Sequence, residues 1–363
     1  MVRKSSKTRD ALLRASGLAK YEPDASKRIS TGCTLLNLAA SGDPDYFTHA
    51  GQYIYFVGDS SSGKTMLVLQ MFAEAAANPN FDDYALVFDN AENGALMDMD
   101  RLFGPRAAAR IRTPEHGISS IVEEFYRSVR HEIRKGPCIY ILDSMDCMGT
   151  RAGNKKQAEI DTEVSGGKDA SGSFGMDKAK ANSDNLRDVV GELQKTGSIL
   201  VIISQTRDNP EAMKFAPKKK HSGGHALDFY AHLSVWTSIT ETIKRTVNKI
   251  ARPIGIVCKC KLKKNRVNGL LRDVSIPIYP SSGIDELGSM VAYLLTEGHW
   301  KVTGGTITTT LMDPTKTTIT GTLDEVVGEI EDYSLEPQLI SEVHKVWQAV
   351  EARCAVERKP RYK

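Results

Sequence analysis

Residues Gly58–Thr65 read Gly-Asp-Ser-Ser-Ser-Gly-Lys-Thr, which fits the pattern G-x-x-x-x-G-K-[ST]. The preceding run Tyr53–Val57 is apolar and aromatic, as expected of a buried strand. The following segment Met66–Ala77 is rich in Met, Leu, Gln and Ala and lacks Pro and Gly, so it predicts a helix. An ordinary turn carrying a surface lysine is the alternative. The strand, glycine-containing turn and helix in this order favour a loop that binds phosphate groups.

The small residues, the lysine and the threonine of such a loop each have a physical role. Small residues let backbone N–H groups curl around a phosphate chain at the helix N-terminus, where the helix dipole favours anions. Lys64 can reach the β and γ phosphates, and the Thr65 hydroxyl can bind Mg²⁺. The motif therefore predicts the phosphate chain of a nucleotide and Mg²⁺ as ligands.

Composition limits the other classes of function. The chain has 363 residues, of which 40% are hydrophobic and 26% charged, as in ordinary globular proteins. The net charge of +3 and the pI near 8.4 mean that any DNA affinity has to come from local patches. No apolar run approaches the length of a membrane span, and Met1–Lys7 is not followed by a hydrophobic signal segment. We expect no membrane association and a cytoplasmic protein.

Strands and helices alternate along the chain. Further continuously apolar runs at Ala85–Asp89, Cys138–Leu142 and Ile199–Ser204 predict strands that are buried on both faces. Helical patterns occupy Ser119–Arg134 and Ala181–Lys195. This order predicts an α/β fold with a doubly wound, mainly parallel sheet and ligands at the carboxyl ends of its strands.

Two long polar connections interrupt this alternation, at Gly149–Lys180 and Thr206–Ser222. Stretches of this length inside a compact domain are usually functional or disordered. Both leave the same sheet edge as Gly58–Thr65, so we expect them near the nucleotide. Three more strand-like segments follow at Ala231–Thr237, Val257–Lys264 and Val274–Pro280.

We expect three regions. Residues 1–30 are basic and polar with one helical stretch, and form either a packing arm for a neighbouring subunit or a solvated tail. Residues 31–283 form the core with its two long loops, at 149–180 and 206–222. Residues 284–363 form a small α+β domain whose basic end, Arg358–Lys363, is interpreted as solvated rather than as a DNA contact.

Polar residues at the strand ends suggest the chemistry. Asp143 ends an apolar strand, where a carboxylate can orient the Mg²⁺ shell or merely cap a turn. Glu92 is our choice of general base, and Asp89 is the alternative because loop register decides which one faces the nucleotide. Gln205 can contact the γ-phosphate or the attacking water, although an isolated glutamine is more often a satisfied polar residue. The predicted nucleotide-binding residues are Gly58, Asp59, Ser60, Ser61, Ser62, Gly63, Lys64, Thr65, Met66 and Asp143, with Thr65 and Asp143 also as metal ligands.

Taken together, these motifs resemble the RecA-family recombinase ATPases of bacterial or phage type. The resemblance covers about Ile29 to Trp300. The stretch Ser222–Ala231 is its most specific part, because many ATPases of this fold lack the Gly-Gly pair. The other matching segments, in family order, are Ile29–Asn37, Gly58–Thr65, Asn90–Glu92, Leu142–Ser144, Ser204–Gln205 and Lys263–Arg266.

The resemblance implies catalytic roles for Lys64, Glu92 and Gln205. It also implies that Lys264 and Arg266 reach the nucleotide of an adjacent subunit, as arginine fingers do. The two long loops match the family's DNA-binding loops, in which a nonpolar side chain wedges between bases; Phe174 and either Met213 or Phe215 are the candidates. The predicted DNA-binding residues are Phe174, Lys180, Arg207, Met213, Phe215, Gly223, Gly224 and His225.

The expected function is ATP-dependent DNA strand exchange by a homo-oligomeric helical filament, with single-stranded and homologous duplex DNA as partners. One alternative is a ring helicase or motor on the same fold, which would not need the pair Gly223-Gly224. A second alternative is a scaffold that binds nucleotide and DNA but hydrolyses ATP poorly. The loop register around Glu92 decides whether this residue faces the nucleotide as a general base, so the scaffold alternative stays open.

Overall fold

The computed structural model describes residues 25–94, 97–155, 174–208, 219–221, 223–311 and 318–358. Most of the predicted N-terminal region, residues 1–24, lies outside this part of the chain, and so do residues 359–363. The strands are β1 (Arg28–Ile29), β2 (Thr48–His49), β3 (Tyr53–Gly58), β4 (Ala85–Asp89), β5 (Ile111–Arg112), β6 (Cys138–Leu142), β7 (Ile199–Asp208), β8 (Lys219–His221), β9 (Leu233–Val247), β10 (Ile250–Asn265), β11 (Asp273–Tyr279), β12 (Gly283–Ile284), β13 (Val302–Thr303), β14 (Thr306–Thr310) and β15 (Thr318–Gly321).

Helices alternate with the strands of the core and dominate the C-terminal part. None of those in the described residues combines the length and the hydrophobicity that a membrane span requires. The helices are α2 (Thr34–Ser41), α3 (Lys64–Ala77), η1 (Pro79–Phe81), α4 (Met99–Phe103), α5 (Pro105–Arg110), α6 (Val122–Lys135), η2 (Met145–Cys147), α8 (Phe174–Thr196), α9 (Ala226–Tyr230), α10 (Glu286–Thr296), α11 (Leu323–Asp332) and α12 (Glu336–Cys354).

A 10-stranded sheet forms the centre of the protein, in the order β12-β11-β10-β9-β3-β7-β6-β4-β5, with β8 paired to β7. Neighbouring strands from β9 through β3 to β5 are parallel, whereas β10, β11 and β12 extend the sheet in antiparallel fashion. The sequence-based prediction of a mainly parallel α/β sheet is therefore confirmed. Strand β3, which precedes Gly58–Thr65, lies in the interior of this sheet.

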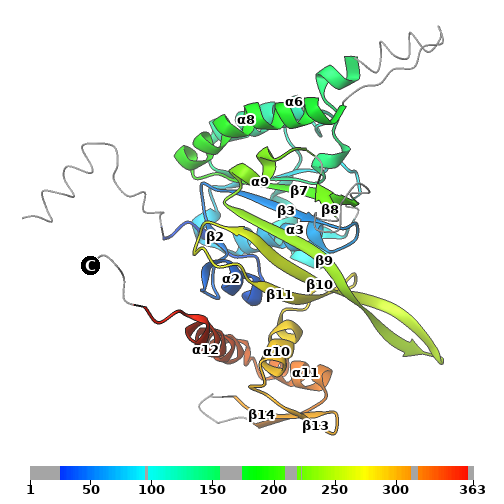
Figure 1. The fold of residues 1–363 in the computed structure, drawn as a ribbon. Coiled ribbons are helices and arrows are strands. Elements are labelled where there is room, and N and C mark those ends of the chain that lie inside the picture. The colour runs from blue at the N-terminus through cyan, green and yellow to red at the C-terminus, as the bar shows by residue number, and fades with distance from the viewer. Residues whose placement is uncertain are drawn as a thin grey trace, which may run out of the picture.

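Helices cover both faces of the sheet, as Figure 1 shows. Alternate residues of β3 point to opposite faces. Tyr53 and Tyr55 belong to one buried cluster with residues of α6 and α8, and Ile54 and Phe56 belong to the other with residues of α2 and α3. Burial on both faces explains why the β3 sequence is continuously apolar.

Strands β9 and β10 form a long hairpin that continues past the sheet. In Figure 1 it projects away from the body of the protein. Asn248 and Lys249, with φ of 52° and 64°, make the left-handed turn at its tip. The predicted strands Ala231–Thr237 and Val257–Lys264 covered only the part of the hairpin inside the sheet.

The C-terminal part contains α10, a three-stranded sheet in the order β13-β14-β15, and the helices α11 and α12. These elements lie in the residues for which the sequence predicts a small α+β region. The Thr322 hydroxyl and the Glu325 carboxylate make a reciprocal capping box at the start of α11. Trp300, Leu339 and Trp347 are buried in the same apolar cluster as α2 and α3, so this part packs continuously against the core.

Candidate functional site

The loop Gly58–Thr65 joins β3 to α3 and needs glycine at two positions. Gly63 has a φ of 87° at the N-terminus of α3, and a Cβ there would lie 2.4 Å from Cδ1 of Ile278. A Cβ on Gly58 would lie 2.0 Å from Oγ1 of Thr237. Close packing against the neighbouring strands β9 and β11 therefore excludes larger residues, and the compact loop places backbone N–H groups at a helix N-terminus.

Lys64 is buried, and its ammonium group lies within the loop. It donates hydrogen bonds to the carbonyl oxygens of Gly58 at 3.1 Å and Asp59 at 2.6 Å. Burial lowers the pKa of Lys64, while the nearby Asp143 and Glu92 carboxylates oppose this effect. The result is a cation held in a partly dehydrated position, where it can interact strongly with an anionic ligand.

Thr65 and Asp143 meet beside this lysine. The Thr65 hydroxyl donates a 3.0 Å hydrogen bond to Oδ2 of Asp143, the residue that follows β6. Burial raises the pKa of Asp143 to about 6, and the Glu92 charge adds to the shift. A hydroxyl and a carboxylate are the hard oxygen ligands that Mg²⁺ prefers alongside phosphate oxygens, so this pair fits the ion. The described residues hold no cluster of three or more His, Cys, Asp or Glu side chains suited to a metal.

Glu92 and Gln205 line the same cavity as the loop. Gln205 is the register partner of Gly58 across β3 and β7, which fixes it beside the phosphate-binding motif. Its Nε2 donates a 3.1 Å hydrogen bond to Oε1 of Glu92. The sheet thus brings together two side chains that are more than a hundred positions apart in the sequence.

Asp89, the alternative general base, is placed differently. It is fully buried, and its carboxylate accepts hydrogen bonds from the Ser119 backbone N–H at 2.9 Å and hydroxyl at 2.6 Å. The Tyr140 hydroxyl donates a third bond at 2.7 Å. These donors hold the carboxylate among residues on the α6 side of the sheet. Glu92, in contrast, borders the cavity beside the loop.

The cavity has a volume of about 560 Å³. Residues Ser60–Met66, Glu92, Asp143 and Gln205 line one side. The rest of the lining is mainly apolar and comes from the β9–β10 hairpin, from β11 and the residue after it, and from Met97 before α4. An aromatic base can pack against such a surface. Sequence reasoning missed this wall, because aliphatic strand residues carry no polar signal of function. Its residues are Met97, Thr242, Pro253, Ile254, Gly255, Ile256, Ile278 and Pro280.

The Gly-Gly pair packs against α8. Gly223 and Gly224 have φ of 95° and 84°, and the Asn182 amide donates a 2.9 Å hydrogen bond to the Gly223 carbonyl. A Cβ on Gly224 would lie 2.5 Å from Cβ of Ala179. His225 is exposed at the start of α9. The pair therefore attaches the end of the second predicted loop to α8.

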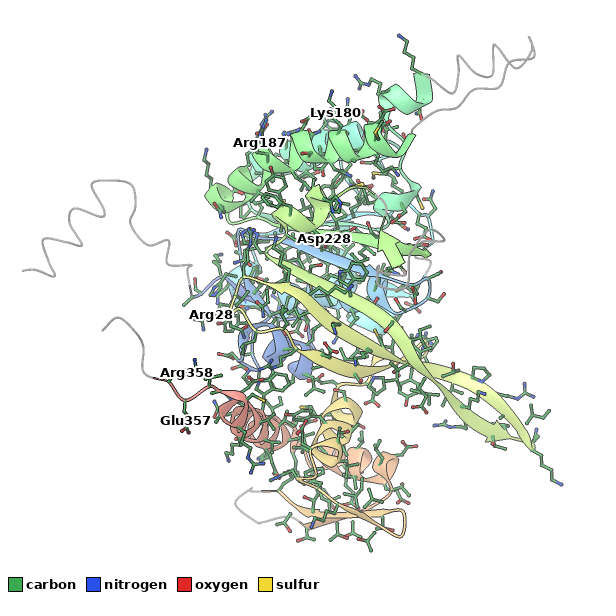
Figure 2. All side chains as sticks on the ribbon, in the orientation of Figure 1. Arg28, Lys180, Arg187, Asp228, Glu357 and Arg358 are labelled. Carbon is green, nitrogen blue, oxygen red and sulfur yellow. The ribbon has the colours of Figure 1, made fainter. Side chains whose placement is uncertain are left out.

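The two predicted loops are shorter than expected. Helix α8 begins at Phe174, so residues 174–180 of the first predicted loop are helical. Lys180 is an exposed residue of this helix, and Figure 2 shows it on the outer side of the protein. At the second loop, β7 continues through Arg207 and pairs with β8. Met213 and Phe215 lie outside the described residues, as do the side chains of Phe174 and Arg207.

Lys264 and Arg266 do not reach the cavity of their own chain. Lys264 pairs with Ser234 on β9, at the opposite end of the parallel strands from the Gly58–Thr237 pair. Its Nζ donates to the backbone carbonyls of Asp228 at 2.8 Å and Phe229 at 2.5 Å. Arg266 donates to the Phe229 carbonyl at 3.3 Å. Both side chains therefore contact the C-terminal end of α9.

A family model and several known proteins resemble this chain. The model of the RecA N-terminal domain family matches residues 152–285. Protein RecA of Rippkaea orientalis is 28% identical over 270 residues, which cover 72% of this chain and 68% of that protein. Protein RecA of Nitratiruptor sp. is 28% identical over 286 residues, covering 76% and 72%. Together with the fold and the loop geometry, these similarities support a protein of the RecA family.

Proposed function

We propose that the protein is an ATP-dependent recombinase. It binds single-stranded DNA, assembles as a helical filament and exchanges strands with homologous duplex DNA. The observation that carries this proposal is the hydrogen bond between Gln205 and Glu92. It joins a carboxylate at the nucleotide cavity to the strand that leads into the second DNA loop, so the two functions meet in one contact.

The nucleotide side of the mechanism rests on Lys64, Thr65 and Asp143. The loop N–H groups and the Lys64 ammonium bind and orient the phosphate chain of ATP. Thr65 and Asp143 would hold Mg²⁺, which neutralises charge on the β and γ phosphates when bound. The apolar wall across the cavity packs against the base and excludes water from it.

Hydrolysis needs a group that takes the proton of the attacking water, and Glu92 is placed for this role. Gln205 holds the Glu92 carboxylate and can contact the γ-phosphate or that water. Asp89 is a poor candidate, because three hydrogen bonds already hold its carboxylate and it does not line the cavity.

In this proposal, DNA binding depends on the two long connections and on the assembly of subunits into a filament. Basic residues of these segments bind the phosphate backbone of DNA, and aromatic residues stack on its bases, with little sequence preference. Lys264 and Arg266 lie outside their own cavity, which supports a role at the nucleotide of an adjacent subunit. A head-to-tail contact with a rotation that does not close produces a filament.

The test measures ATP hydrolysis with and without single-stranded DNA, and images the same samples by electron microscopy. We expect stimulation by single-stranded DNA, helical filaments, and loss of both in Lys64→Ala, which removes the charge that binds the phosphates. Closed rings would indicate the helicase or motor instead. Filaments without hydrolysis would indicate the scaffold, and hydrolysis by Lys64→Ala at the wild-type rate would contradict the assigned nucleotide site.

A further inference from the structure

The phosphate-binding loop, Gly58–Thr65, contains a left-handed residue on each side of Ser62. Ser61 has a φ of 58° and Gly63 a φ of 87°. Glycine adopts this conformation freely, whereas serine does so at a cost in free energy, because its Cβ crowds the backbone. Left-handed residues in such a turn direct successive backbone N–H groups into a concave site for an anion. The contacts of Ser62 therefore bear directly on whether the loop keeps its anion-binding conformation.

Ser62 closes the loop from inside, through the backbone carbonyl of Asp59. Ser62 is fully buried, and its hydroxyl donates a 2.8 Å hydrogen bond to this carbonyl. The Ser62 N–H donates to the same oxygen at 3.3 Å. The Lys64 ammonium group donates to it as well, at 2.6 Å. The Asp59 carbonyl is thus the point where the loop folds onto itself and where the lysine is oriented.

Thr237 holds Ser62 from outside the loop. It lies on β9, beside β3 in the sheet (Figure 1), where it is the register partner of Gly58. Its side chain is buried, and its Oγ1 lies 2.7 Å from Oγ of Ser62. Because the Ser62 proton is directed to the Asp59 carbonyl, Thr237 is the donor in this contact. The Val57 carbonyl is also within reach of Thr237 but at 3.5 Å, so the bond to Ser62 is the stronger one.

These contacts form a chain of hydrogen bonds from β9 to the lysine of the loop. Thr237 donates to Ser62, and Ser62 donates to the carbonyl that Lys64 also contacts. Hydrogen bonds in a buried chain polarise one another, and a buried hydroxyl that loses its partner stays unsatisfied. Thr237 is not among the residues that line the cavity, so it would act on a nucleotide through Ser62 rather than by contact.

We propose that Thr237 is a positioning residue that holds the phosphate-binding loop in its anion-binding conformation before the nucleotide arrives. This role rests on the proposed function, because that function assigns a phosphate chain to the loop. Without the Thr237 hydroxyl, the loop populates other conformations, and the apparent affinity for nucleotide falls with the fraction of molecules that stay competent. Once phosphate is bound, its own contacts hold the loop, so the rate of hydrolysis by the bound complex stays nearly unchanged.

The first test compares Thr237→Val, which keeps the shape but loses the hydroxyl, with Thr237→Ser, which keeps the hydroxyl. Equilibrium binding of ATPγS and of inorganic tripolyphosphate is measured with Mg²⁺ and without DNA. Thr237→Val should bind both ligands about tenfold more weakly, the effect of one lost hydrogen bond at a buried position. Its kcat at saturating ATP should stay within about twofold of the wild-type value. Thr237→Ser should bind both ligands as the wild type does. Equal weakening for both ligands assigns the effect to the phosphate chain, since tripolyphosphate has no base.

Two further variants separate this contact from a general loss of structure. Thr309→Val removes the hydroxyl of a buried strand threonine of β14, in the C-terminal sheet, and should leave the binding of both ligands unchanged. Ser62→Ala removes the other half of the contact and should weaken binding by about tenfold or more. Adding Thr237→Val to Ser62→Ala should cause no further loss, because the two hydroxyls act through one contact. A further tenfold loss in the double variant would show that Thr237 does not act through Ser62 and would overturn the positioning role.

Other outcomes distinguish the role of Thr237 from the proposed function itself. Wild-type affinity in Thr237→Val, an equal loss of affinity in Thr237→Ser, or a fall in kcat alone would overturn the role of Thr237 and leave the nucleotide site standing. If Thr237→Val does not fold, Ser62→Ala carries the test, and wild-type affinity for tripolyphosphate in that variant would overturn the role as well. Wild-type protein that binds neither ATPγS nor tripolyphosphate would overturn the proposed function and the role of Thr237 with it.

Discussion

The side-chain amide of Gln205 donates a 3.1 Å hydrogen bond to the carboxylate of Glu92, across the edge of the sheet where β4 and β7 end. This contact leaves one glutamate oxygen for a second partner within the cavity, since a carboxylate has two acceptor oxygens. In the proposed role of general base, a carboxylate held in this way would be oriented before the nucleotide binds, which reduces the reorganisation that the reaction requires.

Glu92→Gln should lower the rate of ATP hydrolysis by about 10²- to 10⁴-fold, the usual contribution of a general base. The amide keeps the size of the side chain, so binding of ATP should persist. Single-turnover hydrolysis and equilibrium binding of ATP, measured on the same preparation, separate the two effects.

Asp89→Asn is the matched control. Its amide would face the Ser119 and Tyr140 donors in a buried position, which should lower the free energy of unfolding by about 1–3 kcal/mol. Urea unfolding would measure this loss. A catalytic loss in Asp89→Asn as large as in Glu92→Gln, at temperatures where both variants are folded, would identify Asp89 as the base.

The parallel strands were predictable because each is a continuously apolar run ended by polar residues. The predicted bounds Ala85–Asp89 and Cys138–Leu142 coincide with those of β4 and β6. Burial on both faces produces this pattern directly. The phosphate-binding motif and the acids that follow the strands are polar signals on this apolar background, so the sequence also locates most of one side of the cavity.

Elements stabilised by tertiary contacts were harder to predict. Helix α8 begins at Phe174, and its first turns pack against Gly224 through Ala179. Nothing in the local sequence reports that contact. The outer half of the β9–β10 hairpin is exposed on both faces, so it lacks the alternation of apolar and polar residues that reveals a strand. Its turn at Asn248 and Lys249 also lacks the glycine that usually marks such hairpins.

Lys264→Ala and Arg266→Ala should each lose most of the DNA-stimulated ATP hydrolysis while still binding ATP. The physical reason is their position outside the cavity of their own chain, from which the proposed function has them act on the nucleotide of a neighbouring subunit. Lys301→Ala, which removes one exposed positive charge elsewhere, is the control and should retain stimulation.

Mixing tests the placement of these residues directly. Lys64→Ala has an inactive nucleotide site but intact Lys264 and Arg266, so mixing it with Lys264→Ala should restore activity above the sum of the two. The specific activity of the wild type should also fall on dilution. A mixture no more active than its components, with wild-type activity independent of concentration, would place both residues in cis or outside the reaction.

His232 should make stability depend on pH. Burial, helped by the charges of Arg266 and Lys264, lowers the pKa of His232 from its ordinary value of 6.5 to about 4. The unfolded chain therefore takes up a proton before the folded protein does. The stabilising contribution is complete above pH 6.5 and is lost as pH falls toward 4, by about 3 kcal/mol in total.

Urea unfolding of the wild type and His232→Asn between pH 7.5 and 4.5 measures this contribution. An asparagine can accept the 3.3 Å hydrogen bond from the Tyr53 N–H but cannot titrate. The wild type should therefore lose stability relative to the variant as the solution is acidified. A constant difference between the two proteins across this range would show that His232 does not titrate differently in the folded state.

Gly224→Ala should disrupt the attachment of the second loop to α8. Its φ of 84° costs an alanine about 1–2 kcal/mol, and its new Cβ would lie 2.5 Å from Cβ of Ala179. Gly117→Ala is the control for backbone strain alone, because Gly117 has a φ of 83° with nothing within 4 Å of the added Cβ.

Binding to single-stranded DNA, followed by fluorescence anisotropy, should weaken in Gly224→Ala and not in Gly117→Ala. The difference between the variants measures the contact with α8, since both carry the same conformational cost. Equal DNA binding by both variants would mean that this contact does not position the DNA-binding segments, and the Gly-Gly pair would then serve the fold alone.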